Sequence, residues 1–126
     1  MNNRYGLPDD KVDAVRERDR RCVYCHKEMH KPSASVPRKD WATIEHFNHI
    51  PPWDNPDTIG ICCFSCNSSR GNKPILDWFR TKYCKERNIT PTTVARPVLE
   101  YIIKHEGYEE SQQTAPRDAV PAAREL

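Results

Sequence analysis

The stretch CFSCN at residues 63–67 repeats the spacing of CVYC at residues 22–25. Each Cys-x-x-Cys pair places two sulfur atoms close enough to share one tetrahedral ion, and two pairs complete a four-sulfur site. The sequence therefore predicts a structural Zn²⁺ held by Cys22, Cys25, Cys63 and Cys66. Cys62 is an alternative ligand, but Cys63 keeps the two-residue gap to Cys66.

The composition is that of a small globular domain with few core-forming residues. The chain has 126 residues, of which 37% are hydrophobic and 30% charged. A domain of this size buries a limited apolar surface and often needs a structural metal to stay folded. The net charge of +2 does not identify a partner, although basic residues crowd the first 40 positions and suit contact with phosphates.

Neither a signal peptide nor a membrane span is expected. The first residues lack an apolar core, and no run of about 18 apolar residues occurs. We therefore expect a cytoplasmic protein with no membrane partner. In that reducing compartment, six cysteines favour metal binding over disulfides.

The first two thirds of the chain predict a helix, two strands and a second helix. Pro8 opens a helix that runs to about Arg20, because proline suits a first helical turn. Residues 26–40 and 48–57 are rich in proline and predict loops. Between and after these loops we expect a strand at 41–44 leading into 45–46, a strand at 58–62, and a helix at 64–70 that Gly71 ends.

Two more helical segments are expected near the C-terminus. Apolar residues at helical spacing predict one helix from Pro74 to about Arg87. A second segment starts at Thr90, is broken or restarted at Pro97 and ends near His105. Its inner face is expected to hold Val98, Leu99, Ile102 and Ile103. Residues 1–106 are thus predicted to form one domain with its core at 22–73, followed by a disordered tail at 107–126.

A further pattern lies between and after the cysteine pairs. Glu45 and His46 end the first predicted strand, and Asn67 directly follows the last cysteine. Together with both cysteine pairs, the segments 44–47 and 59–71 resemble the HNH endonuclease family, in its subgroup with a four-cysteine structural zinc. The resemblance covers residues 22–73, about two fifths of the chain. It implies an α+β fold with a zinc-stapled ββα-metal (His-Me finger) core and flanking helices.

The resemblance also implies roles for the three residues of this pattern. His46 takes the place of the general base that deprotonates water, and an imidazole with an ordinary pKa of about 6.5 suits that task. Glu45 and Asn67 take the places of ligands to a catalytic divalent ion. Oxygen ligands of this kind fit Mg²⁺ or Mn²⁺, and His49 is a weaker candidate for a third ligand.

The chain departs from the family pattern at three positions. The acidic residue before the histidine is usually Asp, and here it is Glu45, which is one methylene longer. The family's middle Asn, which braces the loop after the histidine, is replaced by Thr58, with Asn55 or Asp57 as substitutes. A proline usually follows three residues after the histidine, where this chain has His49.

DNA is the partner that the resemblance implies. Arg70 and Lys73 follow Asn67 and are candidates to contact phosphates beside the cut. No helix-turn-helix or zinc-finger array accompanies the motif, so low sequence specificity or targeting by a protein partner is expected. The three tryptophans could stack on bases, but core positions are the simpler expectation for them.

The sequence thus favours a metal-dependent DNA endonuclease that leaves 5′-phosphate and 3′-hydroxyl ends. A non-catalytic, zinc-stapled nucleic-acid-binding module is the alternative, and a generic zinc-ribbon interaction domain is a weaker third reading. The four cysteines predict a zinc site under each of them.

Overall fold

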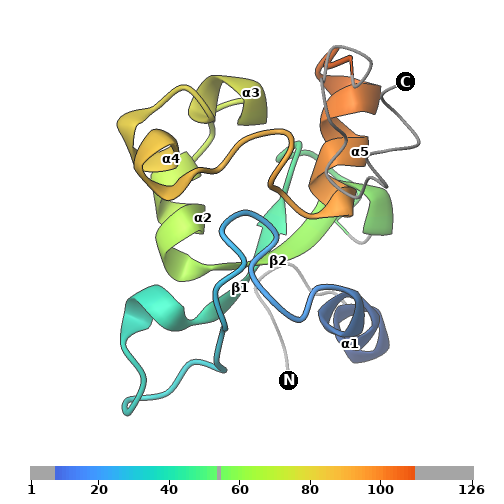
Figure 1. The fold of residues 1–126 in the computed structure, drawn as a ribbon. Coiled ribbons are helices and arrows are strands. Elements are labelled where there is room, and N and C mark those ends of the chain that lie inside the picture. Colours follow the sequence, from blue (N-terminus) through green and yellow to red (C-terminus); the bar gives the residue numbers. More distant parts are fainter. Residues whose placement is uncertain (1–7, 54, 110–126) are drawn as a thin grey trace, which may run out of the picture.

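The computed structural model describes residues 8–53 and 55–109, and it shows a mixed α+β protein with one small antiparallel sheet. In chain order the elements are α1 (Asp9–Arg18), the 3-10 turn η1 (Arg38–Asp40), β1 (Ala42–His46), the 3-10 turn η2 (Pro56–Thr58), β2 (Ile59–Cys63), α2 (Phe64–Arg70), α3 (Ile75–Trp78), α4 (Lys82–Arg87) and α5 (Arg96–His105). The two strands lie at the centre, with α1 on one side and α2 to α5 on the other (Figure 1).

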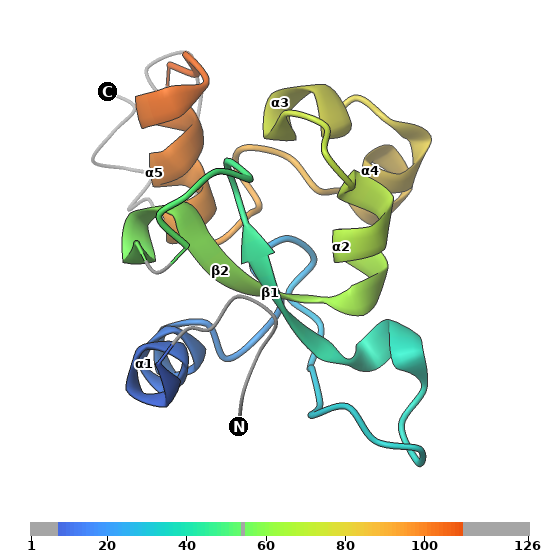
Figure 2. The same cartoon turned by 180° about the vertical axis from the view of Figure 1, so that it is seen from behind.

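The strand register sets the two faces of the hairpin. Ile44 lies opposite Ile61, and Glu45 lies opposite Gly60. Because side chains alternate along a strand, Thr43 and Glu45 share one face while Ala42 and Ile44 share the other. The second face packs against Val15 of α1 in a small cluster with Ile59 and Ile61. The first face meets α2, which runs beside the hairpin (Figure 2).

The main core lies between the first face of the hairpin and the C-terminal helices. Its fully buried members include Tyr24, Phe47, Trp78, Leu99 and Ile102. Trp78 therefore confirms the expected core position, whereas Trp41 and Trp53 are half-buried. The buried thiol of Cys84 belongs to this core, as expected, and burial raises its pKa to about 11.

Helix α2 begins and ends where the sequence predicts. Cys63 caps it by accepting a hydrogen bond from the Cys66 amide at 3.5 Å. Gly71 follows with a φ of 56°, a conformation that glycine adopts without strain. Helix α1 is also confirmed, but it ends at Arg18, two residues before the expected end.

The single helix expected from Pro74 to Arg87 is wrong. The chain forms α3 and α4 instead, separated by a turn at residues 79–81. Thr81 adopts an extended backbone, and its hydroxyl accepts a hydrogen bond from Cys84 N at 3.5 Å. A threonine that satisfies the free amides of a helix start favours a new helix over a continued one.

The last helix also differs from its prediction. Residues 90–93 form a turn instead of a helix, and α5 begins at Arg96 with Pro97 in its first turn. Of the two alternatives at Pro97, the restart is therefore confirmed. Ile103 is 37% exposed, so its expected inward position is wrong, and Tyr101 at 6% takes the inner face instead. The C-terminal part of the predicted tail, residues 110–126, lies outside the described residues. In residues 8–53 and 55–109, no helix has the length and apolar character needed to cross a membrane.

Gly60 marks the tightest contact between the hairpin and the core. A Cβ atom at this position would lie 2.8 Å from Cζ of Phe47, well inside van der Waals contact. We expect Gly60→Ala to destabilise the protein by about 1–3 kcal/mol, as other overpacked cores do. Urea denaturation would measure this loss. The double variant Gly60→Ala/Phe47→Leu should cost less than the two single changes added together, whereas strict additivity would contradict the contact.

Candidate functional site

The four predicted cysteines lie together at the junction of the loop at 22–25 with β2 and α2. Their sulfur atoms all lie within 4.8 Å of one another, and Cys25 Sγ is 3.9 Å from Cys63 Sγ. Four thiolates at about 2.3 Å from one Zn²⁺ would be roughly 3.8 Å apart, so the spacing suits a tetrahedral ion. No disulfide joins these residues. The cluster is therefore arranged so that it could hold a zinc ion.

Each pair is positioned by its own backbone turn. The amides of Tyr24 and Cys25 point at Cys22 Sγ, at 3.4 and 3.5 Å, and the Cys66 amide points at Cys63 Sγ at 3.5 Å. Such N–H groups stabilise negative charge on sulfur. A hydrogen bond from Cys22 also lowers the pKa of Cys63 to about 7 and moves that of Cys25 further below its ordinary value. In the same cluster, the hydrogen bond with Cys25 raises the pKa of Cys22 and the hydrogen bond with Cys22 raises the pKa of Cys66, both far above the ordinary value. Without a metal the four sulfur atoms therefore share protons, and a bound metal would displace them.

Cys62, the alternative ligand, lies on the other face of β2. It is fully buried, and Thr43 Oγ1 lies 3.6 Å from its sulfur. Burial raises the pKa of Cys62 well above its ordinary value, so it stays a neutral thiol. This favours Cys63 as the ligand, as the spacing to Cys66 predicts.

Asn67 reaches from α2 to β1. Its side-chain amide donates to Thr43 Oγ1 at 2.9 Å and to the Ile44 carbonyl at 3.4 Å. Since the amide nitrogen donates, Oδ1 is the atom left to act as an acceptor or ligand. Thr43 and Glu45 share a face of β1, so Asn67 lies on the same side of the hairpin as Glu45.

Glu45 is held in a buried ion pair. Its Oε2 accepts hydrogen bonds from Arg70 Nη1 and from the Tyr24 hydroxyl, both at 2.7 Å. The side chains of Glu45 and Arg70 are only 1% and 2% exposed. Burial and then the charge of Glu45 raise the pKa of Tyr24 well above its ordinary value, so Tyr24 remains a neutral donor. Both bonds fall on Oε2, which leaves Oε1 as the oxygen that could bind an ion.

Arg70 lies in the interior rather than at the surface position expected for a phosphate contact. Besides its bond to Glu45, it donates to the carbonyls of His46 at 3.3 Å and Phe47 at 2.5 Å. Its Nε donates to the backbone carbonyl of Lys73 at 2.8 Å. One guanidinium thus joins the end of α2 to the end of β1. Lys73 is exposed and available to a ligand, with its amine 3.3 Å from the Ser69 carbonyl.

His46 is 2% exposed and lies under the loop that follows it. Its Nε2 is 2.9 Å from the Trp53 carbonyl, and the two rings meet edge to face at 4.9 Å. A carbonyl can only accept, so Nε2 carries the proton and Nδ1 is the nitrogen that could act as a base in the neutral ring.

Thr58, at the position of the family's Asn, bonds to the start of this loop. It does so through its backbone carbonyl. Its carbonyl accepts a hydrogen bond from Phe47 N at 2.8 Å. Its hydroxyl donates to the Asn55 carbonyl at 3.2 Å, and Asn55 Oδ1 accepts from Asp57 N at 2.9 Å. The two substitutes considered from the sequence therefore join Thr58 in one turn. His49 is exposed, with a positive φ of 57°.

Three contacts of this site are absent from the predictions made from the sequence. Tyr24 bonds Glu45, Thr43 bonds Asn67, and Trp53 covers His46. Only Tyr24 has a positional signal, because it lies between Cys22 and Cys25, two predicted zinc ligands whose turn fixes its backbone. Among residues 8–53 and 55–109, the four cysteines form the one group of three or more His, Cys, Asp or Glu ligand atoms close enough to share an ion.

Comparisons of the chain with protein-family models, with curated proteins and with solved structures found no match. The fold and the cluster define the class by themselves: a small α+β protein with a four-cysteine cluster arranged to bind a metal.

Proposed function

We propose that this protein is a zinc-stabilised, metal-dependent DNA endonuclease of the HNH type. The observation that carries the proposal is the unit β1–β2–α2, in which Asn67 extends from α2 to the strand that ends in Glu45 and His46. The order of these elements and the resemblance of their sequence to the family support the same reading. The four cysteines would hold a structural Zn²⁺ at the base of this unit.

Two oxygen atoms of the site suit a divalent ion. Asn67 bonds its partners through its amide nitrogen and Glu45 through Oε2. Asn67 Oδ1 and Glu45 Oε1 are therefore the side-chain oxygens that could bind the ion. Mg²⁺ commonly takes one or two protein oxygens and fills its remaining positions with water and phosphate. Such an ion, when bound, would offset the charge that develops on a phosphodiester during hydrolysis.

His46 would remove a proton from the attacking water through Nδ1, because Nε2 donates to the Trp53 carbonyl. Strand alternation directs Glu45 and His46 to opposite faces of β1. The reacting phosphate would therefore lie at the end of the hairpin, where it could contact both the His46 side and the Glu45 side. The bonds from Arg70 to the carbonyls of His46 and Phe47 would hold that end in place.

Plasmid nicking is the test of this function. Wild-type protein is expected to convert supercoiled DNA to the nicked form in Mg²⁺ or Mn²⁺. His46→Ala should lower the rate by about 10²–10⁴-fold, the usual contribution of a general base. Asn67→Ala should lower it as well, with a greater requirement for the divalent ion.

The matched control is His105→Ala, a histidine that is exposed on α5, and it should cut at the wild-type rate. Zinc content and thermal unfolding are measured on each variant, so that a folding defect is recognised. Nicking that persists in pure His46→Ala, or that needs no divalent ion, would contradict the proposed mechanism.

A non-catalytic nucleic-acid-binding module is the second candidate, and the burial of the site favours it. Glu45 and His46 are 1% and 2% exposed, and each is bonded inside the protein. Duplex binding and cleavage, measured on the same preparation, separate the two functions. Salt-sensitive binding without cleavage in either ion would establish the module.

A further inference from the structure

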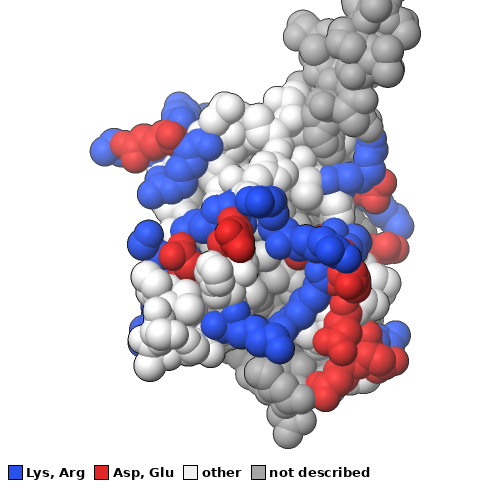
Figure 3. Space-filling view, turned by 60° about the horizontal axis from the view of Figure 1, so that its bottom comes forward, with Lys and Arg blue, Asp and Glu red and all other residues white. Residues whose placement is uncertain are grey.

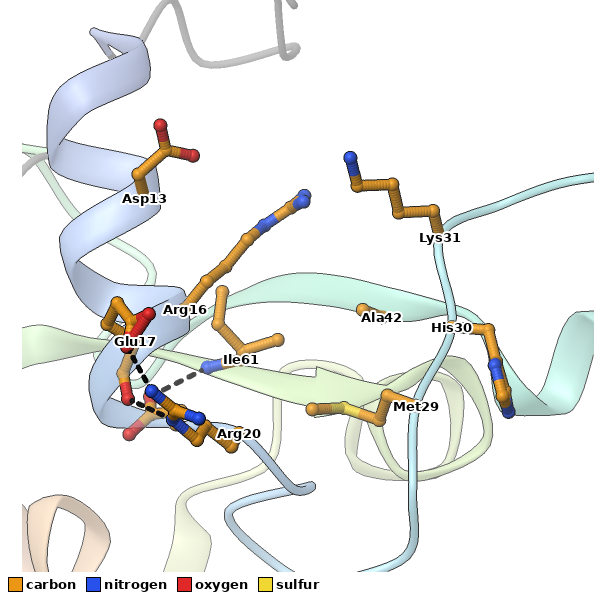
Figure 4. A pocket seen from close by; sticks show the side chains of 10 residues that line it. Asp13, Arg16, Glu17, Arg20, Met29, His30, Lys31, Ala42 and Ile61 are labelled. Atoms are coloured by element: carbon orange, nitrogen blue, oxygen red, sulfur yellow. Dashed lines mark hydrogen bonds and ion pairs between the residues drawn. The ribbon is translucent and has the colours of Figure 1, made fainter.

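A second concave surface lies on the opposite side of the hairpin from Glu45 and Asn67. It is a groove of about 490 Å³ between α1 and the segment at residues 29–31 (Figure 4). Met29, Ala42 and Ile61 form its apolar floor. Ala42 belongs to the face of β1 that packs toward α1, so this groove does not overlap the site described above.

Half of the six Asp, Glu, Lys and Arg residues that line the groove are already paired. Asp19 is 5% exposed, and its carboxylate bonds Arg18 at 2.8 Å and the Ile61 amide at 3.0 Å. Glu17 pairs with Arg20 on the surface. These bonds neutralise two of the three acidic residues that line the groove.

Two cations remain, one from each wall. Arg16 extends from α1 and Lys31 from the facing segment, and both side chains reach over the groove (Figure 4). In the described part of the chain neither has a salt bridge, and the buried Nε of Arg16 has no hydrogen-bond partner. Asp13 at the rim is the one acidic residue of this lining that no described cation neutralises. Two like charges over one apolar floor gain energy when an anion lies between them.

The surrounding surface extends this positive character. Lys and Arg side chains border much of a hollow on this face of the molecule; the largest acidic cluster lies to the right of it, and further acidic side chains lie among the cations above it (Figure 3). Cations that extend beyond a single anion pocket suit a polymer with repeated negative charges better than a lone anion.

We propose that this groove binds the phosphodiester backbone of a nucleic acid, with a phosphate between Arg16 and Lys31 and the sugar edge against the apolar floor. The inference rests on the proposed function for the identity of the polymer as DNA. It adds a contact on the far side of the hairpin, so that the duplex is held by α1 as well as at the proposed site of cleavage. Arg16 and Lys31 are then binding residues with no part in the chemical step.

Fluorescence anisotropy with a labelled 20-base-pair duplex, without added divalent ion, tests the groove. Arg16→Gln/Lys31→Gln should raise Kd about tenfold. It should also reduce the slope of log K against log salt by about 0.9, because the two cations share one phosphate and each phosphate contact contributes about that much. The control Lys85→Gln/Lys104→Gln removes two exposed cations from α4 and α5 and should leave the slope nearly unchanged. Asp13→Asn should act in the opposite direction and tighten binding, since it removes the unpaired acid at the rim.

Equal Kd values and slopes for the wild type and the Arg16/Lys31 variant would overturn the groove proposal. A second pair of results would also overturn it: duplex binding that becomes tighter when residues 1–7 are deleted, while Arg16→Gln/Lys31→Gln still has no effect. This pair would mean that residues 1–7, and not DNA, occupy the groove. Nicking at saturating DNA is measured separately: it should survive the groove changes and disappear with His46→Ala. Failure of either proposal is therefore visible without the other.

Discussion

Loss of the metal from the four-cysteine cluster is expected to unfold this protein. The cluster joins the turn at 22–25 to the start of α2, and all four cysteines contact or belong to the main core. A chain that is 37% hydrophobic has a small apolar core to replace that connection. Structural Zn²⁺ contributes apparent binding free energies of about 10–16 kcal/mol in zinc-finger peptides, which exceeds the whole stability of an ordinary small domain.

Cysteine variants and a chelator measure this effect. Purified protein should contain one zinc per chain, and a strong chelator should abolish the cooperative thermal transition. Cys22→Ser should bind zinc weakly and show the same loss. Cys84→Ser, which alters a buried thiol outside the cluster, should keep its zinc and lose only a few kcal/mol.

The pair Cys62→Ala and Cys63→Ala distinguishes the two candidate ligands. Cys62→Ala should keep one zinc, whereas Cys63→Ala should lose it, because Cys63 Sγ lies in the cluster and Cys62 lies on the opposite face of β2. The reverse result would move the site to Cys62. If the metal-free wild type melts at an unchanged temperature, the metal does not stabilise the fold.

The parts of the fold that the sequence predicts are those set by local chemistry. The paired cysteines specify their cluster by spacing alone, and Gly71 ends α2 because its positive φ is easy for glycine. The sequence does not predict the division between α3 and α4, because apolar residues keep their helical spacing across it. There the hydroxyl of Thr81, which caps α4, outweighs helix periodicity.

The candidate site was less predictable, because its contacts join distant parts of the chain. Arg70 carries the same charge as the exposed Lys73, and no local pattern distinguishes a buried cation from a solvated one. Its position follows from Glu45, 25 residues earlier, and from two backbone carbonyls at the end of β1. An unpaired carboxylate in this core would be costly, so the partner had to be found inside the fold.

The buried pair of Glu45 and Arg70 leads to the second large prediction. Arg70→Met keeps the length of the side chain but leaves the Glu45 carboxylate buried with Tyr24 as its remaining partner. Breaking one side of a buried ion pair commonly costs about 3–5 kcal/mol. Arg80→Met, which alters an exposed arginine in the turn before α4, should change stability by less than about 0.5 kcal/mol.

Glu45→Gln completes a double-mutant cycle and also tests the role of the carboxylate. Glutamine can still accept the bond from Tyr24, but it leaves the Arg70 charge unpaired. We expect the double variant Glu45→Gln/Arg70→Met to be more stable than the summed single losses predict, by more than about 1 kcal/mol in urea denaturation. Additive losses would mean that the two side chains do not depend on each other.

Stability measured with and without Mg²⁺ then shows whether the Glu45 carboxylate is only structural or also binds the ion. A ligand bound only by the folded protein raises its stability by RT ln(1 + [L]/Kd), so a tighter site gives a larger effect at the same ion concentration. Mg²⁺ should therefore stabilise the wild type more than Glu45→Gln if Oε1 coordinates it. Equal stabilisation of both proteins would leave Glu45 as a residue that positions β1 through Arg70. In that case the divalent ion of the proposed nuclease would depend on Asn67, and Asn67→Ala would be the variant that removes the response to Mg²⁺.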